Sequence, residues 1–307
     1  MRRVLLALLL LLVAAIALPP LYFAVFPAEV FELPPPGRRI PVGDGVAVNA
    51  VERGAGPPVV LVHGLPGTAY DWAPLTEALA ARGLFALAYG RVGFGRSDPR
   101  PGDDFTVEAN ARELVALLEA EDLRDATVIG WSYGGPVAIR AAGFAPDRIA
   151  RLVLVGSGGP AEVMQEPPAA AAVLFSRPVL AWMSAVPPVA RGLRSVFFVQ
   201  AFSEGPQPDW WMTHVHANLD NPTALRAWRE EGARFGSEEL YLEAAPQPIL
   251  LIHGDDDRSA PLAISEWFHR NAADSELLVI DGGSHMLPIT HADLLADRIA
   301  AFVGVGS

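Results

Sequence analysis

A single serine lies between two aromatic residues and is bounded by glycines in the segment GWSYGG, Gly130 to Gly135. An apolar, β-branched run, Ala126–Ile129, precedes it, and a helical pattern follows from Gly135 to Ala145. In this context the Gly-x-Ser-x-Gly spacing is typical of a sharp strand-to-helix turn that lifts the serine hydroxyl into a cleft. The pentapeptide alone is a weak signal, because ordinary strand-to-helix turns are also rich in glycine.

A serine hydroxyl is a poor nucleophile unless a base removes its proton, and a third group must orient that base. Two downstream loops supply candidates. The run Ile249–His253 is followed by three aspartates, Asp255–Asp257, and the run Glu276–Ile280 is followed by a loop that contains His285. The loop after Val155 contains no acid. The chain therefore provides nucleophile, acid and base, in that order.

Ester cleavage by a serine also needs donors for the negative charge of the tetrahedral intermediate. The glycine-rich turn His63-Gly64-Leu65-Pro66-Gly67 follows the apolar run Val59–Val62. We expect this turn to direct the amide of Leu65 toward the serine, and we expect the amide of Tyr133 to be the second donor. His63 and His253, both in His-Gly turns, are expected to stabilise loop backbones.

The elements that must position these residues alternate along the chain. Runs typical of strands are Val46–Val51, Pro58–His63, Leu84–Tyr89, Ala126–Ile129, Ile149–Val155, Ile249–His253 and Glu276–Ile280. Helical patterns are Trp72–Arg82, Thr106–Ala120, Gly135–Ala145, Pro261–Asn271 and Thr290–Val303. Apolar strands separated by helices predict a mostly parallel sheet covered on both faces, with the chemistry at the carboxyl ends of the strands. The stretch 158–247 breaks this alternation and predicts a helical cap.

Composition limits the class of protein. The 307 residues include no cysteine, which excludes disulfides, thiolate catalysis and Cys-ligated metals. The net charge of −12 and the lack of a basic run argue against a nucleic-acid partner. His214 and His216 in the cap lack a convincing ligand set for a metal.

The amino terminus indicates a membrane segment. Met1-Arg2-Arg3 precedes an apolar run from Val4 to Leu18, and a second apolar piece extends to Phe26 after two prolines. The whole segment reaches the roughly 20 residues that span a bilayer. We expect residues 1–31 to be an uncleaved signal anchor that leaves the rest outside the cytoplasm; the alternative is a cleaved signal peptide and a secreted protein. Residues 32–45 are proline-rich at first and are expected to be a linker.

Taken together, these motifs resemble the α/β-hydrolase superfamily. The turn from His63 to Gly67 is similar to its oxyanion turn, the segment Gly93–Asp98 to its glycine loop, and the segment Gly130–Gly134 to its nucleophile elbow. Gly254-Asp255-Asp256-Asp257 resembles the family's Gly-x-x-Asp acid turn, which selects Asp257, and the segment around His285 resembles its histidine loop. Gly90 departs from the family, in which many members have an aspartate there.

The resemblance implies an α/β fold with an eight-stranded-type sheet, built from residues 46–157 and 248–307, with the cap at 158–247. It implies Ser132 as nucleophile, His285 as base and Asp257 as the orienting acid, with no cofactor and no metal. We predict a serine hydrolase for carboxylic esters with an apolar acyl or alcohol part, bound to a membrane through its N-terminal segment. Alternatives on the same triad are a carbon–carbon bond hydrolase, a prolyl-type aminopeptidase, a lactonase and a perhydrolase. A non-catalytic binding protein is an alternative from a different class, and the complete triad argues against it. The sequence gives no indication of oligomeric state.

Overall fold

The computed structural model describes residues 2–102, 104–164, 176–236, 242 and 245–305. The chain divides into two compact units. The smaller, which we call the helical unit, combines Met1–Phe31 with Glu166–Phe198. The larger, which we call the sheet unit, combines Glu32–Gln165 with Val199–Ser307.

The sheet unit is built on one eight-stranded sheet with the strand order β1-β2-β4-β3-β5-β6-β7-β8. The pairs β1–β2 and β2–β4 are antiparallel, and all other neighbours are parallel. This mostly parallel eight-stranded sheet confirms the predicted fold class. The strands are β1 (Arg38–Pro41), β2 (Ala47–Arg53), β3 (Pro58–Val62), β4 (Phe85–Tyr89), β5 (Ala126–Trp131), β6 (Ile149–Val155), β7 (Ile249–Gly254) and β8 (Ser275–Ile280).

The central strands form from residues that are mostly apolar. Every residue of β5 and of β7 is buried, as expected for strands of a parallel sheet that helices cover on both faces. The sequence did not predict β1, which lies in the segment 32–45 that was expected to be a linker. Of its four residues only Ile40 is buried, so this short antiparallel edge strand leaves no apolar run in the sequence.

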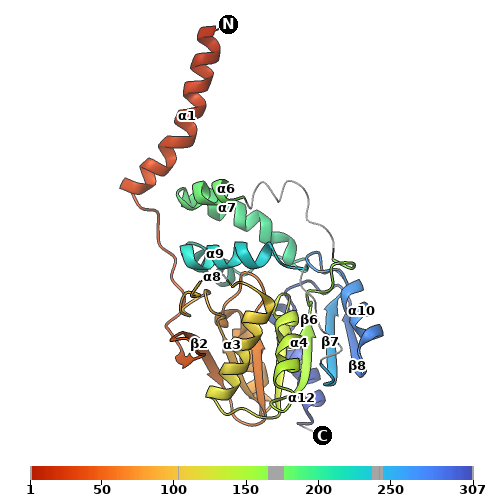
Figure 1. Cartoon of the computed structure of the whole chain (residues 1–307). Helices are drawn as coiled ribbons and strands as arrows, with labels where there is room; N and C mark the ends of the chain where they lie inside the picture. The colour runs from red at the N-terminus through yellow and green to blue at the C-terminus, as the bar shows by residue number, and fades with distance from the viewer. Residues whose placement is uncertain (1, 103, 165–175, 237–241, 243–244, 306–307) are drawn as a thin grey trace. The chain divides into compact units, whose positions relative to one another are not determined.

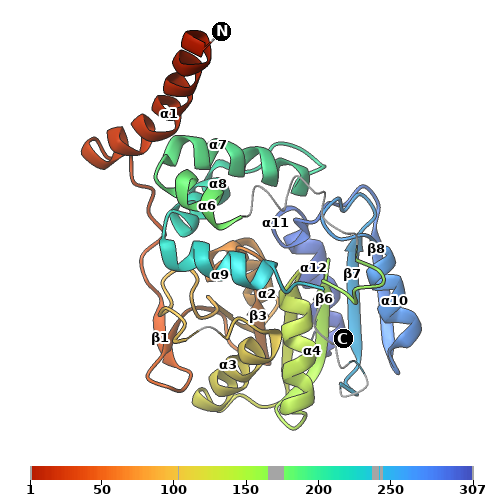
Figure 2. The ribbon, with the colours of Figure 1, turned by 45° about the horizontal axis from the view of Figure 1, so that its top comes forward.

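Helices cover both faces of the sheet. α3 and α4 pack against each other, and so do α2 and α12. Figure 1 shows α3 and α4 side by side in front of the sheet, and Figure 2 shows α12 behind it. The helices of the sheet unit are η1 (Ala69–Trp72, a 3-10 helix), α2 (Ala73–Ala81), α3 (Val107–Ala120), α4 (Gly134–Phe144), η2 (Val199–Ala201, also 3-10), α8 (Asp209–Leu219), α9 (Pro222–Gly232), α10 (Ala263–Asn271), α11 (Leu287–Thr290) and α12 (Ala292–Val303).

The helical unit contains α1 (Arg2–Val25), α6 (Arg177–Ser184) and α7 (Pro187–Phe198). Within α1, the 18 residues Leu8–Val25 have a mean hydropathy of 2.5, and none of them is buried. The helix is therefore long and apolar enough to cross a bilayer, although a signal sequence at an N-terminus has the same properties. The predicted cap thus contributes α6 and α7 to this unit, and α8 and α9 to the sheet unit.

Candidate active site

Ser132 occupies the turn between β5 and α4 in a strained conformation. Its φ angle is +55°, in the left-handed region that serine rarely adopts. The glycines on either side are needed because the chain segments are too close for side chains. A Cβ on Gly130 would lie 2.4 Å from the carbonyl oxygen of Gly134, and a Cβ on Gly134 would lie 2.1 Å from that of Val62. This is the strand-to-helix turn that the sequence predicted.

His285 and Asp257 form a hydrogen-bonded pair, with 2.7 Å between His285 Nδ1 and Asp257 Oδ2. The other oxygen of Asp257 accepts the amides of Ser259 and Ala260, each at 2.8 Å. Burial would raise the pKa of Asp257, but the charge of His285 and the hydrogen bonds from His285 and Ala260 outweigh it and lower that pKa. A carboxylate therefore faces Nδ1, so Nδ1 carries the hydrogen and Nε2 presents its lone pair.

The loop after β6 connects this pair with the serine turn. The amide of Ser132 donates to the carbonyl of Val155 at 3.1 Å, and the amide of Gly158 donates to the carbonyl of Ser132 at 2.9 Å. Gly156 lies between Val155 and Gly158 in this loop, and a Cβ on Gly156 would be 3.0 Å from Asp257 Oδ2 and 3.2 Å from His285 Nδ1. The predicted nucleophile, acid and base therefore converge on one loop.

Trp131, the last residue of β5, makes a second connection. Its indole Nε1 donates to the carbonyl of His285 at 2.9 Å, so the residue next to Ser132 holds the backbone of His285 directly. Within the described residues, no hydrogen bond joins Ser132 Oγ to the imidazole, and Nε2 of His285 has no partner. Catalytic hydrogen bonds are often long or absent before substrate binds.

The turn after β3 passes directly beside the serine. A Cβ on Gly64 would lie 2.7 Å from the Cβ and 3.3 Å from the Oγ of Ser132. Among the described residues, the amide of the neighbouring Leu65 donates no hydrogen bond. Tyr133 is the N-cap residue of α4, at the end of the helix where amides point outward. Both predicted oxyanion residues thus flank Ser132 from neighbouring strand ends.

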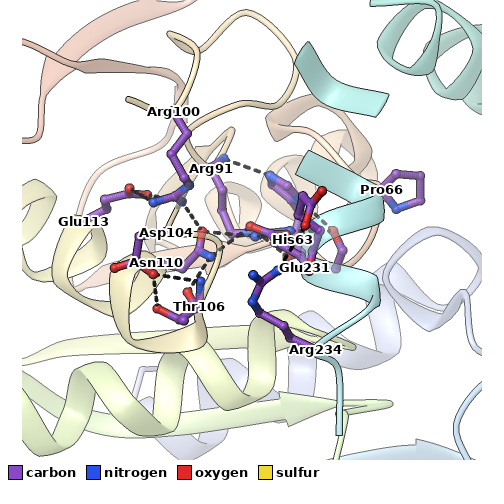
Figure 3. A network of polar contacts seen from close by, with 12 residues as sticks. His63, Pro66, Arg91, Arg100, Asp104, Thr106, Asn110, Glu113, Glu231 and Arg234 are labelled. Atoms are coloured by element: carbon purple, nitrogen blue, oxygen red, sulfur yellow. Dashed lines mark hydrogen bonds and ion pairs between the residues drawn. The ribbon is translucent and has the colours of Figure 1, made fainter. Parts of the chain in front are cut away.

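A fully buried polar network supports this turn (Figure 3). The amide of Arg91 donates to His63 Nε2 at 2.9 Å, so Nδ1 of His63 carries the hydrogen and donates to the carbonyl of Gly64 at 2.8 Å. The guanidinium of Arg91 donates to the carbonyls of His63 and Gly64 at 3.3 and 3.4 Å. Burial, together with the charge of Arg91, lowers the pKa of His63 well below its ordinary value. His63 is therefore a neutral structural group, as the sequence led us to expect.

The charge of Arg91 is neutralised by Glu231 of α9, at 2.7 Å, and both side chains are completely buried. Asn110 of α3 completes the arrangement: its Oδ1 accepts from Arg91 at 3.1 Å and its Nδ2 donates to Glu231 at 2.9 Å. Asn218 of α8 donates to the carbonyl of Pro66 at 2.6 Å and accepts from the amide of Gly95 at 2.8 Å. Helix α8 is thus hydrogen-bonded to the predicted oxyanion turn, and helix α9 is hydrogen-bonded to the arginine that holds this turn.

His253 supports the acid in a similar way. Its Nε2 lies 2.9 Å from the carbonyl of Ala260, its Nδ1 lies 2.7 Å from Ser265 Oγ, and burial lowers its pKa. It is therefore neutral, and it fixes the loop from which Asp257 projects. The sequence analysis missed Arg91, Glu231, Asn110 and Asn218. The only signal in the sequence was Arg91, an arginine within a glycine-containing turn. The pairing of the four residues depends on contacts between segments that are far apart along the chain.

Comparison with known proteins now identifies the family. The model of the alpha/beta hydrolase fold matches residues 57–292, and the chain belongs to this family. It is 28% identical over 283 residues to a 2-hydroxy-6-oxononadienedioate/2-hydroxy-6-oxononatrienedioate hydrolase of Paraburkholderia xenovorans, covering 86% of this chain and 93% of the relative. It is also 28% identical to a non-heme haloperoxidase of Rhodococcus erythropolis, covering 86% and 98%. The fold is shared with an esterase from Exiguobacterium antarcticum, with a TM-score of 0.71 at 21% identity, covering 87% and 99%.

Proposed function

We propose that the protein is a serine hydrolase that cleaves carboxylic esters through an acyl-enzyme. The observation that carries the proposal is the 2.7 Å bond between His285 and Asp257, which lies against Gly156 in the loop after β6 that is also hydrogen-bonded to the backbone of Ser132. This bond leaves Nε2 of His285 available as a base on the side away from the carboxylate. The strained turn at Ser132 supplies the hydroxyl.

The proposed reaction has two halves. In the first, His285 Nε2 takes the proton of Ser132 Oγ as that oxygen attacks the ester carbonyl, and the amides of Leu65 and Tyr133 stabilise the resulting oxyanion. The tetrahedral intermediate collapses, the bond to the alcohol breaks, and His285 gives its proton to the leaving oxygen. In the second half, His285 deprotonates water as the water oxygen attacks the acyl-enzyme. The second tetrahedral intermediate then collapses, the bond between the acyl carbon and Ser132 Oγ breaks, His285 returns the proton to Ser132 Oγ, and the acid leaves. Asp257 stays ionised throughout and stabilises the imidazolium.

The substrate class is argued from the apolar parts of the chain. We propose an ester with an apolar acyl or alcohol part, because the chain has an apolar N-terminal helix and an Ala-, Phe- and Trp-rich cap. A serine at the elbow forms an acyl ester with a carbonyl substrate, whereas the alkyl-enzyme ester of an epoxide or haloalkane needs a carboxylate there.

One of the three named relatives, the 2-hydroxy-6-oxononadienedioate hydrolase, supports an alternative, a carbon–carbon bond hydrolase. An aminopeptidase has less support, because an amine site needs available carboxylates in the cap. Glu231 is paired with Arg91, Glu230 with Arg229 and Arg234, and Glu204 with the amide of Ser284, which leaves the exposed Asp209 at the start of α8 as the remaining candidate of the four. A panel of esters, vinylogous 2-hydroxy-6-oxo acids and aminoacyl amides distinguishes these activities by relative kcat/KM.

Replacing Ser132 by alanine tests the mechanism. We expect Ser132→Ala to lower kcat on short p-nitrophenyl esters by roughly 10⁴- to 10⁶-fold and to abolish labelling by a fluorophosphonate probe. Ser275→Ala is the control and should retain both, because the Ser275 hydroxyl is hydrogen-bonded to His269 at the start of β8, away from the loops at the strand's carboxyl end. Undiminished turnover by folded Ser132→Ala would refute the proposal, and failure of the probe to label folded wild-type protein would favour a non-catalytic binder.

We also propose that α1 anchors the protein in a membrane with the sheet unit outside the cytoplasm. Two arginines precede the apolar helix, and such residues are retained on the cytoplasmic side. In spheroplasts, protease added from outside should digest the sheet unit. Protection of the sheet unit until the membrane is permeabilised would contradict this orientation, and recovery of a soluble chain that lacks residues 1–17 would favour a cleaved signal.

A further inference from the structure

The segment that contains α6 and α7 differs in charge from the rest of the molecule. The chain has a net charge of −12, yet residues 167–203 contain no aspartate and no glutamate. The same residues include three arginines, Arg177, Arg191 and Arg194. Solubility does not explain this cationic, largely apolar segment, because the acidic residues elsewhere in the chain already give the protein a large net charge.

One side of α7 is apolar and exposed. Val189, Leu193, Val196 and Phe197 recur at the spacing that places residues on one side of a helix, and Val196 and Phe197 are 67% and 51% exposed. The two arginines of α7, Arg191 and Arg194, fall on its other side. Contiguous exposed apolar side chains mark surfaces that meet another apolar phase. We call these four residues the α7 stripe.

The α6–α7 pair is attached to the carboxyl half of α1. Pro20 has no amide hydrogen, so the carbonyl of Ile16 lacks its helical donor, and the indole of Trp182 on α6 donates to it at 2.8 Å. Arg191 of α7 donates to the carbonyl of Glu29 at 2.6 Å and stacks over the ring of Phe31 at 4.4 Å. Helix α1 therefore cannot enter a bilayer up to its carboxyl end without bringing α6 and α7 to the lipid boundary.

We propose that the α7 stripe rests in the surface of the bilayer that α1 enters, with Arg191 near anionic headgroups; Arg194 is buried and makes no contact of this kind. The inference depends on the membrane role proposed for α1, and it adds a second, interfacial contact. An amphipathic helix with arginines on one side and valine, leucine and phenylalanine on the other is typical of helices that lie in the interface. Arginines near an anionic surface add attraction that a neutral stripe lacks.

The absence of native cysteine allows a site-specific test on the full chain. Val196→Cys is labelled with an environment-sensitive fluorophore and reconstituted in vesicles of phosphatidylethanolamine and phosphatidylglycerol. Val279→Cys is the matched control, because Val279 is also an exposed valine, at 41%, on β8 of the sheet unit. We expect the label at 196 to emit further to the blue than the label at 279. We also expect a lipid with a nitroxide near the headgroup to quench the label at 196 at least threefold more strongly.

Two results would overturn the proposal. Equal quenching at both positions would show that the stripe does not meet lipid. Blue-shifted emission at position 196 without quenching by the nitroxide lipid would mean that protein covers the stripe, either the sheet unit or a second copy of the chain.

A second measurement uses the proposed ester hydrolysis. We expect the double variant V196E/F197E in the same vesicles to cleave a long-chain ester dissolved in the bilayer about tenfold more slowly, and a water-soluble p-nitrophenyl ester at the wild-type rate. Equal loss on both substrates would contradict a docking role. If the wild-type protein cleaves neither ester, the proposed function fails, and the fluorescence experiment still decides the docking.

Discussion

His63 and His285 both lie in loops at the carboxyl ends of parallel strands, and both are largely buried. Their ring nitrogens nevertheless have different hydrogen-bond partners. Both nitrogens of His63 are occupied, one by the amide of Arg91 and the other by the carbonyl of Gly64. His285 uses only Nδ1, on Asp257, and its Nε2 has no partner among the described residues. The difference separates a group that supports a turn from one that can accept a proton.

The carboxylates of the two regions differ in the same way. Asp257 accepts a hydrogen bond from the imidazole of His285, so its charge is available to stabilise a cation that forms there during a reaction. Glu231 faces Arg91, which is always charged, and both are completely buried. This buried pair holds α9 against the loop that contains Arg91. Each prediction below alters one side of this comparison.

The largest effect is expected from Asp257→Asn. The amide can no longer stabilise an imidazolium and favours the wrong tautomer of His285, so kcat on p-nitrophenyl esters should fall by about 10⁴-fold. Asp256→Asn is the control. Its exposed pair with Arg258 contributes little, and kcat should stay within about twofold of wild type. A loss with Asp256→Asn as large as that with Asp257→Asn would mean that the acid has been misassigned.

Glu231→Ala should reduce stability more than any change in the triad. It leaves the charge of Arg91 buried and unpaired, which costs about 3–5 kcal/mol in the free energy of unfolding by urea. Glu266→Ala, on α10, breaks an exposed ion pair with Arg270 and should cost about 1 kcal/mol or less. Similar losses for both variants would contradict the comparison.

A double variant separates stability from positioning in this region. Arg91→Met combined with Glu231→Met should recover most of the lost stability, because apolar side chains can replace a buried ion pair. It should not recover kcat, since the guanidinium no longer holds the carbonyls of His63 and Gly64 beside the serine. Full recovery of both quantities would show that Arg91 does not position the oxyanion turn.

The smallest effect concerns pH. His63 stays neutral in the fold, whereas in the unfolded chain it binds a proton near its ordinary pKa of 6.5. The unfolded state therefore binds more protons below this pH, so His63 makes stability rise with pH and fall toward acid. Between pH 6 and 5, the unfolding free energy of His63→Asn should change less steeply than that of wild type, by about 1 kcal/mol per pH unit. Identical slopes would show that His63 is protonated in the fold.

The fold was largely predictable from the sequence. The seven apolar runs correspond to β2 to β8 within one or two residues. The clearest patterns belong to the interior strands, because strands buried on both faces are mostly apolar. β1 was not predictable, since an edge strand with one buried side chain, Ile40, has no pattern to detect.

The candidate site was predictable only where chemistry restricts residue type and position together. Ser132, Asp257 and His285 each follow a strand in a glycine-containing loop, and the fold brings those loops together. Glu231 and Asn218 follow no such rule, because their partners are 140 and 152 residues away along the chain. A buried pair of this kind is specified by packing, which one sequence does not reveal. The catalytic roles themselves stay predictions until the variants are measured.

The buried pair between α9 and the Arg91 loop has a consequence for engineering. A chimera that takes its cap from a relative would place an arbitrary side chain where Glu231 lies, opposite an arginine that cannot lose its charge. Such grafts should fail to fold unless the donor supplies a carboxylate there or the recipient loses Arg91. Libraries that aim at new substrate ranges would therefore do better to hold positions 91, 110 and 231 constant and to diversify elsewhere in the insertion.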